Sequence, residues 1–400
     1  MVNSSALMIP LPTRIDRYPA KMISHLADRL VSKYATNATH VLDPFCGSGA
    51  VLRAAMAHNI QVTGVDINPF GVLLSSVKVE GFDPKRAHDL LNGILRDSER
   101  HKLLPIDWDM KNYWFTPATL EKLESIRAIA YERNLHSSKS GRAVLLSIGL
   151  AARLCSKADQ RSPKPFISKT ARKRRRGKHY SPAPIITSLL NDLSTLYGTR
   201  RSVKGKVITC DIGNSDRIRN MEGKCSHAIT SPPYINAQDY FRNSKLELYL
   251  LEKLIPFSVK NIRDKFIGSE RGLDSTVINS ERAEIHRKRV PQLLYLEQHK
   301  RELAVIVHTY LQRMENAFSA TKKSMNSGGT LVVVCGDNLI GGKRIVTWKV
   351  LNEILTDLGF ILFDSFEDKI RNRAVAPSRC GHKGLIKQEV VSAFRLSECP

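Results

Sequence analysis

The chain of 400 residues is long enough for one large domain or two ordinary ones, and its hydrophobic fraction of 42% is that of a globular protein. Lys and Arg number 62 against 38 Asp and Glu, which gives a net charge of +24. Repulsion among these positive charges destabilises a compact chain unless an anionic partner, usually nucleic acid, neutralises them. The 7 cysteines are scattered without a CxxC pair, and no apolar run is long enough for an export signal or a membrane span. We therefore expect a protein of the reducing cytoplasm that has no disulfide framework, no metal site and no membrane partner.

Up to about residue 80, helical and strand patterns alternate, as in a parallel sheet covered by helices. The predicted elements are a helix over 18–34, a strand over 40–43, a helix over 50–58, a strand over 61–66 and a helix over 70–79.

Between residues 81 and 205 the alternation is lost. Aromatic-rich or helical stretches over 108–115 and 119–131 precede a buried helix over 143–154. A dense basic run follows this helix. Its like charges cannot pack together, so we expect an exposed loop, which either contacts nucleic-acid phosphates or is simply solvated. This basic run comprises Arg172, Lys173, Arg174, Arg175, Arg176 and Lys178.

Regular alternation resumes near residue 206. The predicted elements are strands over 207–211 and 227–230, a helix over 238–254, a charged segment over 256–289, a long helix over 293–325, a strand over 330–335, a helix over 345–358, and strands over 360–366 and 389–396. We therefore expect a Rossmann-like α/β domain from residues 14–80 and 206–396, with a mostly parallel sheet and an antiparallel edge strand. Residues 81–205 form a helical, basic insertion in it.

The first predicted strand ends in the turn Asp43-Pro44-Phe45-Cys46-Gly47-Ser48-Gly49. In a doubly wound sheet this turn borders the ligand crevice, and its two glycines allow the backbone to approach a ligand closely. Leu52 stands where a third glycine would complete the dinucleotide pattern, which disfavours a dehydrogenase. Asp66 ends the next strand, where its carboxylate could accept two ribose hydroxyls or merely cap the following helix.

A second motif, Thr230-Ser231-Pro232-Pro233-Tyr234, directly follows a predicted strand. Two prolines fix the backbone and remove two amide donors, which leaves local carbonyls free to accept hydrogen bonds. An amino group bonded to such a carbonyl and to a serine oxygen would direct its lone pair at a methyl donor, and Tyr234 offers a face for an unstacked base. Taken alone, the motif is better explained as a proline-rich turn with an incidental tyrosine.

Together with Gly64–Pro69, these motifs resemble those of the bacterial site-specific DNA amino-methyltransferases. The FxGxG cofactor motif of that family is matched by Phe45, Gly47 and Gly49, and its (D/N/S)PP(Y/F) catalytic motif by the segment that begins at Ser231. The serine form is typical of N4-cytosine enzymes, whereas adenine-modifying members more often carry Asp. The resemblance implies a class I S-adenosylmethionine-dependent methyltransferase fold.

The resemblance also implies roles for individual residues. Ser231, Pro232, Pro233 and Tyr234 would form the reaction site. The segment from Arg17 to Lys21 would close over the cofactor, and Asp211 would lie near its adenine unless it only caps its strand. The residues that would bind S-adenosylmethionine are Tyr18, Lys21, Asp43, Phe45, Cys46, Gly47, Gly49, Asp66, Ile67 and Asp211.

The nucleophile determines the expected mechanism. The exocyclic amine of cytosine is weak, so hydrogen bonds to Ser231 and to a carbonyl at Pro232 would favour a tetrahedral nitrogen and direct in-line methyl transfer. A base inside a duplex is out of reach and would be flipped out. Methylation at a ring carbon instead needs a cysteine nucleophile, usually in a Pro-Cys pair. No Pro-Cys dipeptide occurs in this sequence, and Cys46 lies within the cofactor turn.

The implied partners are double-stranded DNA and a cognate restriction endonuclease, in a nucleoid-associated cytoplasmic system. Size and charge favour residues 81–205 over the segment 256–289 as the region that recognises the target. Three alternatives stay open: N6-adenine methylation of DNA, methylation of a base in RNA, and a basic nucleic-acid-binding protein that has lost catalysis.

Overall fold

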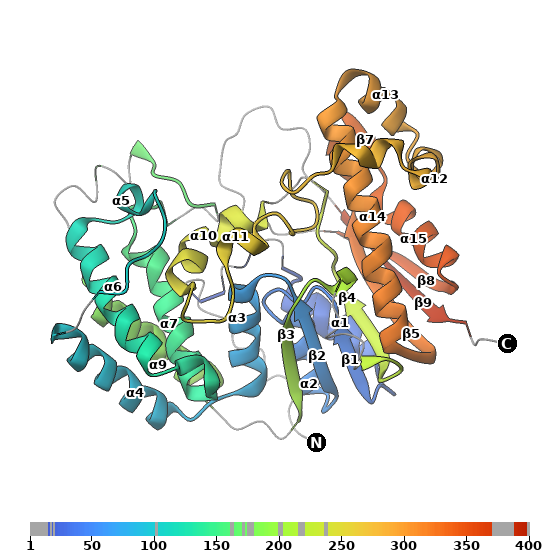
Figure 1. Ribbon diagram of the computed structural model, residues 1–400. Helices are drawn as coiled ribbons and strands as arrows, with labels where there is room; N and C mark the ends of the chain where they lie inside the picture. The colour runs from blue at the N-terminus through green and yellow to red at the C-terminus, as the bar shows by residue number, and fades with distance from the viewer. Residues whose placement is uncertain are drawn as a thin grey trace. The chain divides into compact units, whose positions relative to one another are not determined.

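The computed structural model describes residues 15–16, 18, 21–100, 103–160, 164–169, 173, 180–198, 203–214, 221–235, 239–369 and 388–397. The chain divides into two compact units (Figure 1). Unit 1 comprises Met1–Pro19, Asn68–Lys204 and Tyr240–Ile262, and unit 2 comprises Ala20–Ile67, Gly205–Asp239 and Arg263–Pro400. The expected catalytic domain, residues 14–80 and 206–396, is therefore divided between the two units: its residues up to Pro19, Asn68 to 80, and Tyr240–Ile262 belong to unit 1, and the rest belong to unit 2.

Unit 2 is built on a seven-stranded sheet with the strand order β3-β2-β1-β4-β5-β9-β8. The first five strands of this order pair in parallel, and β9 is antiparallel to both of its neighbours. The predicted mostly parallel sheet is thus confirmed, with the antiparallel strand one place in from the edge. The strands are β1 His40–Asp43, β2 Gln61–Asp66, β3 Gly205–Thr209, β4 Cys225–Thr230, β5 Met325–Gly336, β8 Phe360–Lys369 and β9 Gln388–Leu396.

The chain order along this sheet reverses between β1 and β4, which are hydrogen-bonded neighbours. At such a switch point the connections leave the two strands toward opposite faces, and a crevice opens at the carboxyl ends of the strands. The carboxyl ends of β1, β2 and β4 carry the motifs identified in the sequence.

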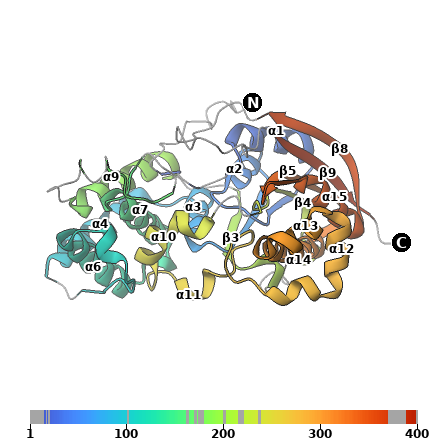
Figure 2. The same ribbon diagram turned by 90° about the horizontal axis from the view of Figure 1, so that it is seen from above.

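Helices cover both faces of this sheet. Figure 2 shows α1 and α2 on one side of the strands and α14 on the other. Side chains of α14 such as Leu311, Met314 and Phe318 are fully buried in one cluster with Leu331 of β5. The helices of unit 2 are α1 Ser24–Tyr34, α2 Ala50–Ala57, α12 Glu281–Arg289, α13 Gln292–His299, α14 Arg301–Ser324 and α15 Thr347–Asp357, with 3-10 turns η4 Ile212–Asn214 and η6 Ser275–Asn279 and a hairpin of β6 Asn338–Ile340 and β7 Lys343–Ile345.

Unit 1 is helical and is organised around α7, which is buried along almost its whole length and contacts α3, α4, α9 and α10. The guanidinium of Arg127 on α6 donates to the carbonyls of Leu104, Leu250 and Glu252 at 2.6, 2.9 and 2.8 Å, so it satisfies carbonyls at the end of α10. The helices are α3 Pro69–Glu80, α4 Pro84–Asp97, α5 Lys111–Trp114, α6 Pro117–Glu132, α7 Lys139–Cys155, α9 Pro182–Tyr197, α10 Tyr240–Leu251 and α11 Val259–Ile262, with 3-10 turns η2 Ser98–Arg100 and η3 Leu135–Ser137.

Two predicted helices were wrong in extent. The single helix expected over 293–325 is broken at Lys300, whose backbone angles of φ −149° and ψ 56° are not helical, and therefore forms α13 and α14. The helix expected from residue 18 begins only at Ser24.

Two long helices, α4 and α9, lie between residues 81 and 205, where the sequence has no regular alternation of helical and strand patterns. Each begins with a proline, whose fixed φ suits the first helical position. The Asp83 side chain caps α4 by accepting the amide of Arg86 at 3.1 Å. The start signals were therefore present in the sequence.

Candidate active site at the carboxyl ends of the parallel strands

The turn after β1 adopts a conformation that only glycine takes easily at two positions. Gly47 and Gly49 have φ values of +46° and +78°. The amide of Cys46 donates to the carbonyl of Val65 at 2.9 Å, and the amide of Gly49 donates to the carbonyl of Cys46 at 2.7 Å. The turn is thereby tied to β2 and directs the chain into α2, whose N-terminal amides face the carboxyl end of the sheet.

Close packing of α2 on β2 depends on Gly64. A Cβ atom at Gly64 would lie 2.5 Å from Cδ1 of Leu52 and 2.9 Å from Sγ of Cys46. Leu52 is fully buried there. In a dinucleotide motif, the third glycine lies on the helix and allows the helix to pack closely on the strand. Here the residue without a side chain is instead Gly64, on the strand.

Asp43 is buried and links the cofactor turn to β4. Its Oδ1 accepts the hydroxyl of Thr230 at 2.7 Å and the amide of Phe45 at 3.2 Å. Burial, helped by the nearby Asp66 carboxylate, raises the pKa of Asp43 to about 7, and the two hydrogen bonds oppose the change only in part. The site thus holds a carboxylate that a bound cation would stabilise in its charged form.

Asp66 and Asp211 end neighbouring strands. The Asp66 side chain accepts the amide of Gly47 at 2.8 Å, and its carbonyl accepts the amide of Cys210 at 3.1 Å. Oδ1 of Asp211 accepts the amide of Gly213 at 3.1 Å and so shapes the turn η4. The structure therefore brings both predicted carboxylates to the edge that carries the glycine turn.

The predicted reaction loop follows β4 directly. Ser231 and Pro233 are half-buried, and Pro232 is buried. The ring of Tyr234 is only 6% exposed, and its hydroxyl donates to Oε1 of Glu389 on β9. Stacking of a base on this ring would therefore require the ring or a neighbour to move.

The remaining predicted site residues lie outside the glycine turn and the reaction loop. Tyr18 belongs to unit 1, where its hydroxyl accepts the Asn68 side-chain amide at 3.3 Å. Ile67 is half-buried after β2, whereas Lys21, ahead of α1, and Lys173 of the basic run are exposed. Outside the described residues lie Arg17, Pro19, Ala20, Arg172, Arg174, Arg175, Arg176 and Lys178.

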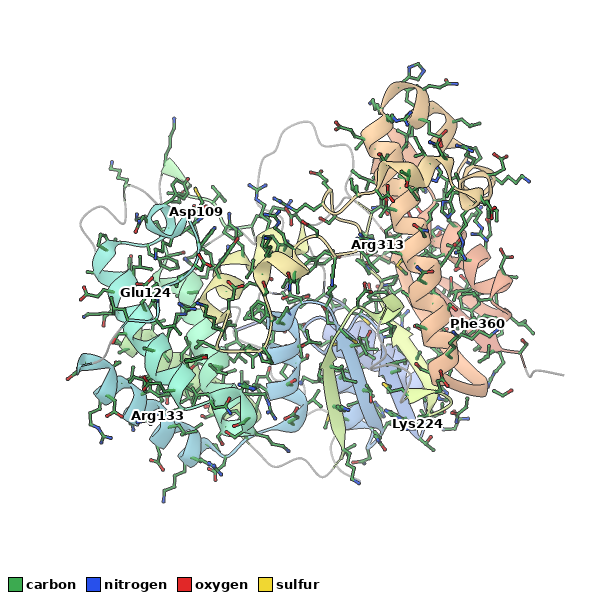
Figure 3. All side chains as sticks on the ribbon, in the orientation of Figure 1. Asp109, Glu124, Arg133, Lys224, Arg313 and Phe360 are labelled. Atoms are coloured by element: carbon green, nitrogen blue, oxygen red, sulfur yellow. The ribbon has the colours of Figure 1, made fainter. Side chains whose placement is uncertain are left out.

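Three positioning residues were missed in the sequence. Thr230, quoted only as the start of its motif, holds Asp43, and Glu389 holds Tyr234. Arg313 of α14, labelled in Figure 3, donates to the carbonyls of Gly272, Phe266 and Asp264 at 2.9, 3.4 and 3.5 Å.

Burial lowers the pKa of Arg313, and the carboxylate of Asp211 opposes this effect. The arginine thus ties the segment 264–272 to α14 beside Asp211. Nothing in the sequence distinguishes this arginine from others on a long amphipathic helix.

Two kinds of feature are absent from the part of the chain that the structure describes. Among the described residues, no group of three or more His, Cys, Asp or Glu side chains is arranged to hold a metal ion. No helix in the described part of the chain is long and apolar enough to cross a membrane.

The strand order of unit 2, its antiparallel β9 and the glycine turn followed by an acidic strand end define a class I methyltransferase fold. Within that class, residues 4–75 match the family model described as DNA methylase (N6_N4_Mtase).

Curated relatives agree with this match. The chain is 30% identical over 131 residues to the type II methyltransferase M.MvaI of Kocuria varians, covering 29% of each protein. It is 29% identical over 85 residues to the type II methyltransferase M.MjaII of Methanocaldococcus jannaschii, covering 21% of this chain and 16% of that protein. The matched segments thus span less than a third of either relative. They confirm the resemblance to site-specific DNA methyltransferases and do not distinguish N4 from N6.

Solved structures are similar only at a distance. The rRNA methyltransferase aviRa of Streptomyces viridochromogenes has a TM-score of 0.31 at 10% identity, covering 99% of this chain and 93% of that one. A structure from Thermus thermophilus named as a DNA modification methylase has a TM-score of 0.19 at 18% identity, covering 27% of this chain and 42% of that one. The fold assignment rests on the strand order instead.

Proposed function

We propose that the protein transfers a methyl group from S-adenosylmethionine to the exocyclic N4 of cytosine in duplex DNA. The observation that carries the proposal is the hydrogen bond from Thr230 to Asp43. It joins the strand end before the Ser231-Pro232-Pro233-Tyr234 loop to the strand end before the glycine turn. A methyl donor bound at that turn would therefore lie beside the loop.

The residues at the turn suit this cofactor. S-adenosylmethionine carries an ammonium group, a sulfonium group and a ribose. Burial raises the pKa of Asp43 by more than its hydrogen bonds lower it. A cationic group of the cofactor bound beside Asp43 would lower this pKa and so stabilise the carboxylate. Asp66 would accept ribose hydroxyls, and Asp211 would lie near the adenine. When bound, the cofactor supplies an electrophilic methyl group.

The reaction loop would act by holding the amine. Its two prolines have no amide hydrogen, so carbonyls of the loop remain available as acceptors. Ser231 and the carbonyl at Pro232 would accept hydrogen bonds from the two N–H groups of the amine and direct the nitrogen lone pair at the methyl group. Rate acceleration then comes from positioning and electrostatics, without a covalent intermediate. The serine at the first position is the reason for proposing cytosine over adenine.

The substrate and setting follow from the same proposal. A duplex base would have to be flipped out to reach the loop, at a cost of a few kcal/mol that phosphate contacts offset. We assign target recognition to residues 81–205, including the basic run around Lys173. A cognate restriction endonuclease and a nucleoid-associated location in the cytoplasm complete the proposed system.

The test is incubation of the purified protein with labelled S-adenosylmethionine and unmethylated plasmid DNA, followed by nucleoside mass spectrometry. We expect N4-methylcytosine, and a kcat about 100-fold lower in Ser231→Ala with unchanged cofactor affinity, because an acceptor of the reacting amine is lost. The matched control is Ser32→Ala, which removes an exposed serine on α1 and should leave kcat unchanged.

The products separate the alternatives. N6-methyladenine would keep the mechanism and reject the base assignment. Label in RNA alone would reject DNA as the substrate, and cofactor binding without any labelled product would indicate a protein that no longer catalyses the reaction.

A further inference from the structure

A basic and apolar surface of unit 2 extends over α13, the start of α14 and the β6–β7 hairpin. We call it the α13–hairpin surface. Its apolar members are large and open, since Leu294 is 54% exposed and Leu339 is 48% exposed. Its exposed side chains are Leu294, Tyr295, His299, Lys300, Arg301, Leu339, Lys343 and Arg344.

Direct contacts join the helix and the hairpin into one surface. Nζ of Lys300 donates to the carbonyl of Gly341 at 2.7 Å, and Nε2 of Gln292 donates to the carbonyl of Arg344 at 3.0 Å. Nζ of Lys343 lies 4.1 Å from the ring centroid of Tyr295, a cation–π distance. The surface is therefore continuous although its two parts are distant in sequence.

A buried polar network holds α13 against α12 and α14. Oε1 of Glu297 accepts Nε2 of His308 at 2.8 Å and Nε of Arg287 at 3.1 Å. Nδ1 of His308 lies 3.0 Å from Nδ1 of His286, and both rings are fully buried. Because the network connects three helices, the groups on the outer face of α13 are held on a rigid support.

The surface stands at the same edge of the sheet as the reaction loop. β6 begins two residues after β5 ends, and β5 pairs in parallel with β4, so the hairpin and the loop both follow carboxyl ends of neighbouring strands. The side chain of Asn338 donates to the carbonyl of Ile235 at 3.0 Å, directly after Tyr234. Figure 1 shows β7 and α13 near the N-terminal end of α14.

The outward charge of the surface is positive. Glu297 is engaged by Arg287 and His308, and Asp337 is paired with Arg344 at 2.5 Å. Lys300, Arg301 and Lys343 are exposed, against the exposed carboxylate of Glu302. Positive side chains that alternate with apolar ones can contact the phosphates and the sugars of a nucleic-acid backbone.

We propose that the α13–hairpin surface binds the phosphate backbone of the DNA whose target base enters the reaction loop. This inference rests on the proposed function and adds a second contact region to residues 81–205. Phosphates bound here, next to the loop, would fix the position of the strand that carries the flipped base.

The test measures the affinity of a fluorescent 30-base-pair duplex by anisotropy between 50 and 300 mM salt. In Arg301→Gln/Lys343→Gln, loss of two phosphate contacts should reduce the slope of log K against log salt by about 1.8 and weaken binding about 10- to 30-fold at 150 mM salt. The affinity for S-adenosylmethionine should not change, because both side chains are exposed. Lys343→Arg keeps the charge and should keep the slope.

The matched control removes the same charge from the other end of unit 2. Lys224, labelled in Figure 3, directly precedes β4, and Lys323 lies in the last turn of α14, about 33 Å along the helix from Arg301. Both are exposed, and Lys224→Gln/Lys323→Gln should bind like the wild type.

The outcomes separate this inference from the function on which it rests. A wild-type slope and affinity in Arg301→Gln/Lys343→Gln, in a protein that still methylates DNA, would overturn the proposed surface alone. Equal weakening in the control pair would also overturn it, because the effect would then be one of net charge. A wild-type protein that neither binds nor methylates DNA would overturn both proposals.

Discussion

Asp43 shows how one residue can be recognisable in the sequence while its electrostatic state is not. Its place at the end of a strand before a glycine turn predicted a cofactor contact. Its burial and its bond to Thr230 depend on β4, which is 187 residues away in the chain. The raised pKa is therefore a property of the folded sheet.

The first residue-scale prediction concerns stability against pH. Because folding raises the pKa of Asp43 from 3.8 to about 7, the folded state favours the protonated form. The resulting stability is complete below about pH 4 and is lost as pH rises through 7. Between pH 5.5 and 8.5 the free energy of unfolding of the cofactor-free wild type should fall by about 2 kcal/mol because of Asp43. The fall is about 1.4 kcal/mol per pH unit and ends near the folded pKa.

The comparison variant is Asp43→Asn, which cannot ionise and keeps an oxygen for Thr230 and Phe45. Urea unfolding of both proteins at the two pH values measures the difference. Equal pH dependence in the two proteins would show that Asp43 does not titrate in this range.

The strands and helices around the sheet were mostly predictable from local patterns. β1 and β2 have the predicted bounds, because short apolar runs that end in turns specify strands well. The break at Lys300 was not predictable, because the apolar periodicity continues across it and only packing on unit 2 decides where the chain bends. Tertiary contacts overrode local propensity at that position.

At the element scale we predict that Gly64→Ala disrupts the packing of α2 on β2. The new Cβ would lie 2.5 Å from Leu52 and 2.9 Å from Cys46, so the free energy of unfolding should fall by about 1–3 kcal/mol. Thermal unfolding measures this change.

The double variant Gly64→Ala/Leu52→Ala tests whether the loss of stability comes from this steric clash. Removal of the Leu52 side chain makes room for the new methyl group, so the double variant should be more stable than the sum of the two single effects predicts. Simple additivity would indicate that Gly64 and Leu52 do not compete for space.

The charge of the whole molecule was evident from composition, and it has a consequence beyond any one site. A net charge of +24 destabilises a compact chain by self-repulsion. At low salt, heparin should therefore raise the melting temperature by several degrees, and added NaCl should raise it less, since a bound polyanion neutralises more charge than screening does. Dextran, a neutral polymer, serves as the control. A melting temperature insensitive to heparin would show that the basic residues do not form anion-binding surfaces.

The sequence by itself determined the class of fold and the two motifs at its functional edge. These features are local, since each strand, turn and motif is specified by a few consecutive residues. Only the tertiary structure decided which residues support them. Thr230 meets Asp43, Glu389 meets Tyr234, and Asn338 joins the hairpin to the reaction loop through contacts between strands that are adjacent in the sheet and far apart in the chain. Sheet order is set by how helices and strands bury their apolar faces together, and that choice cannot be made from any single segment.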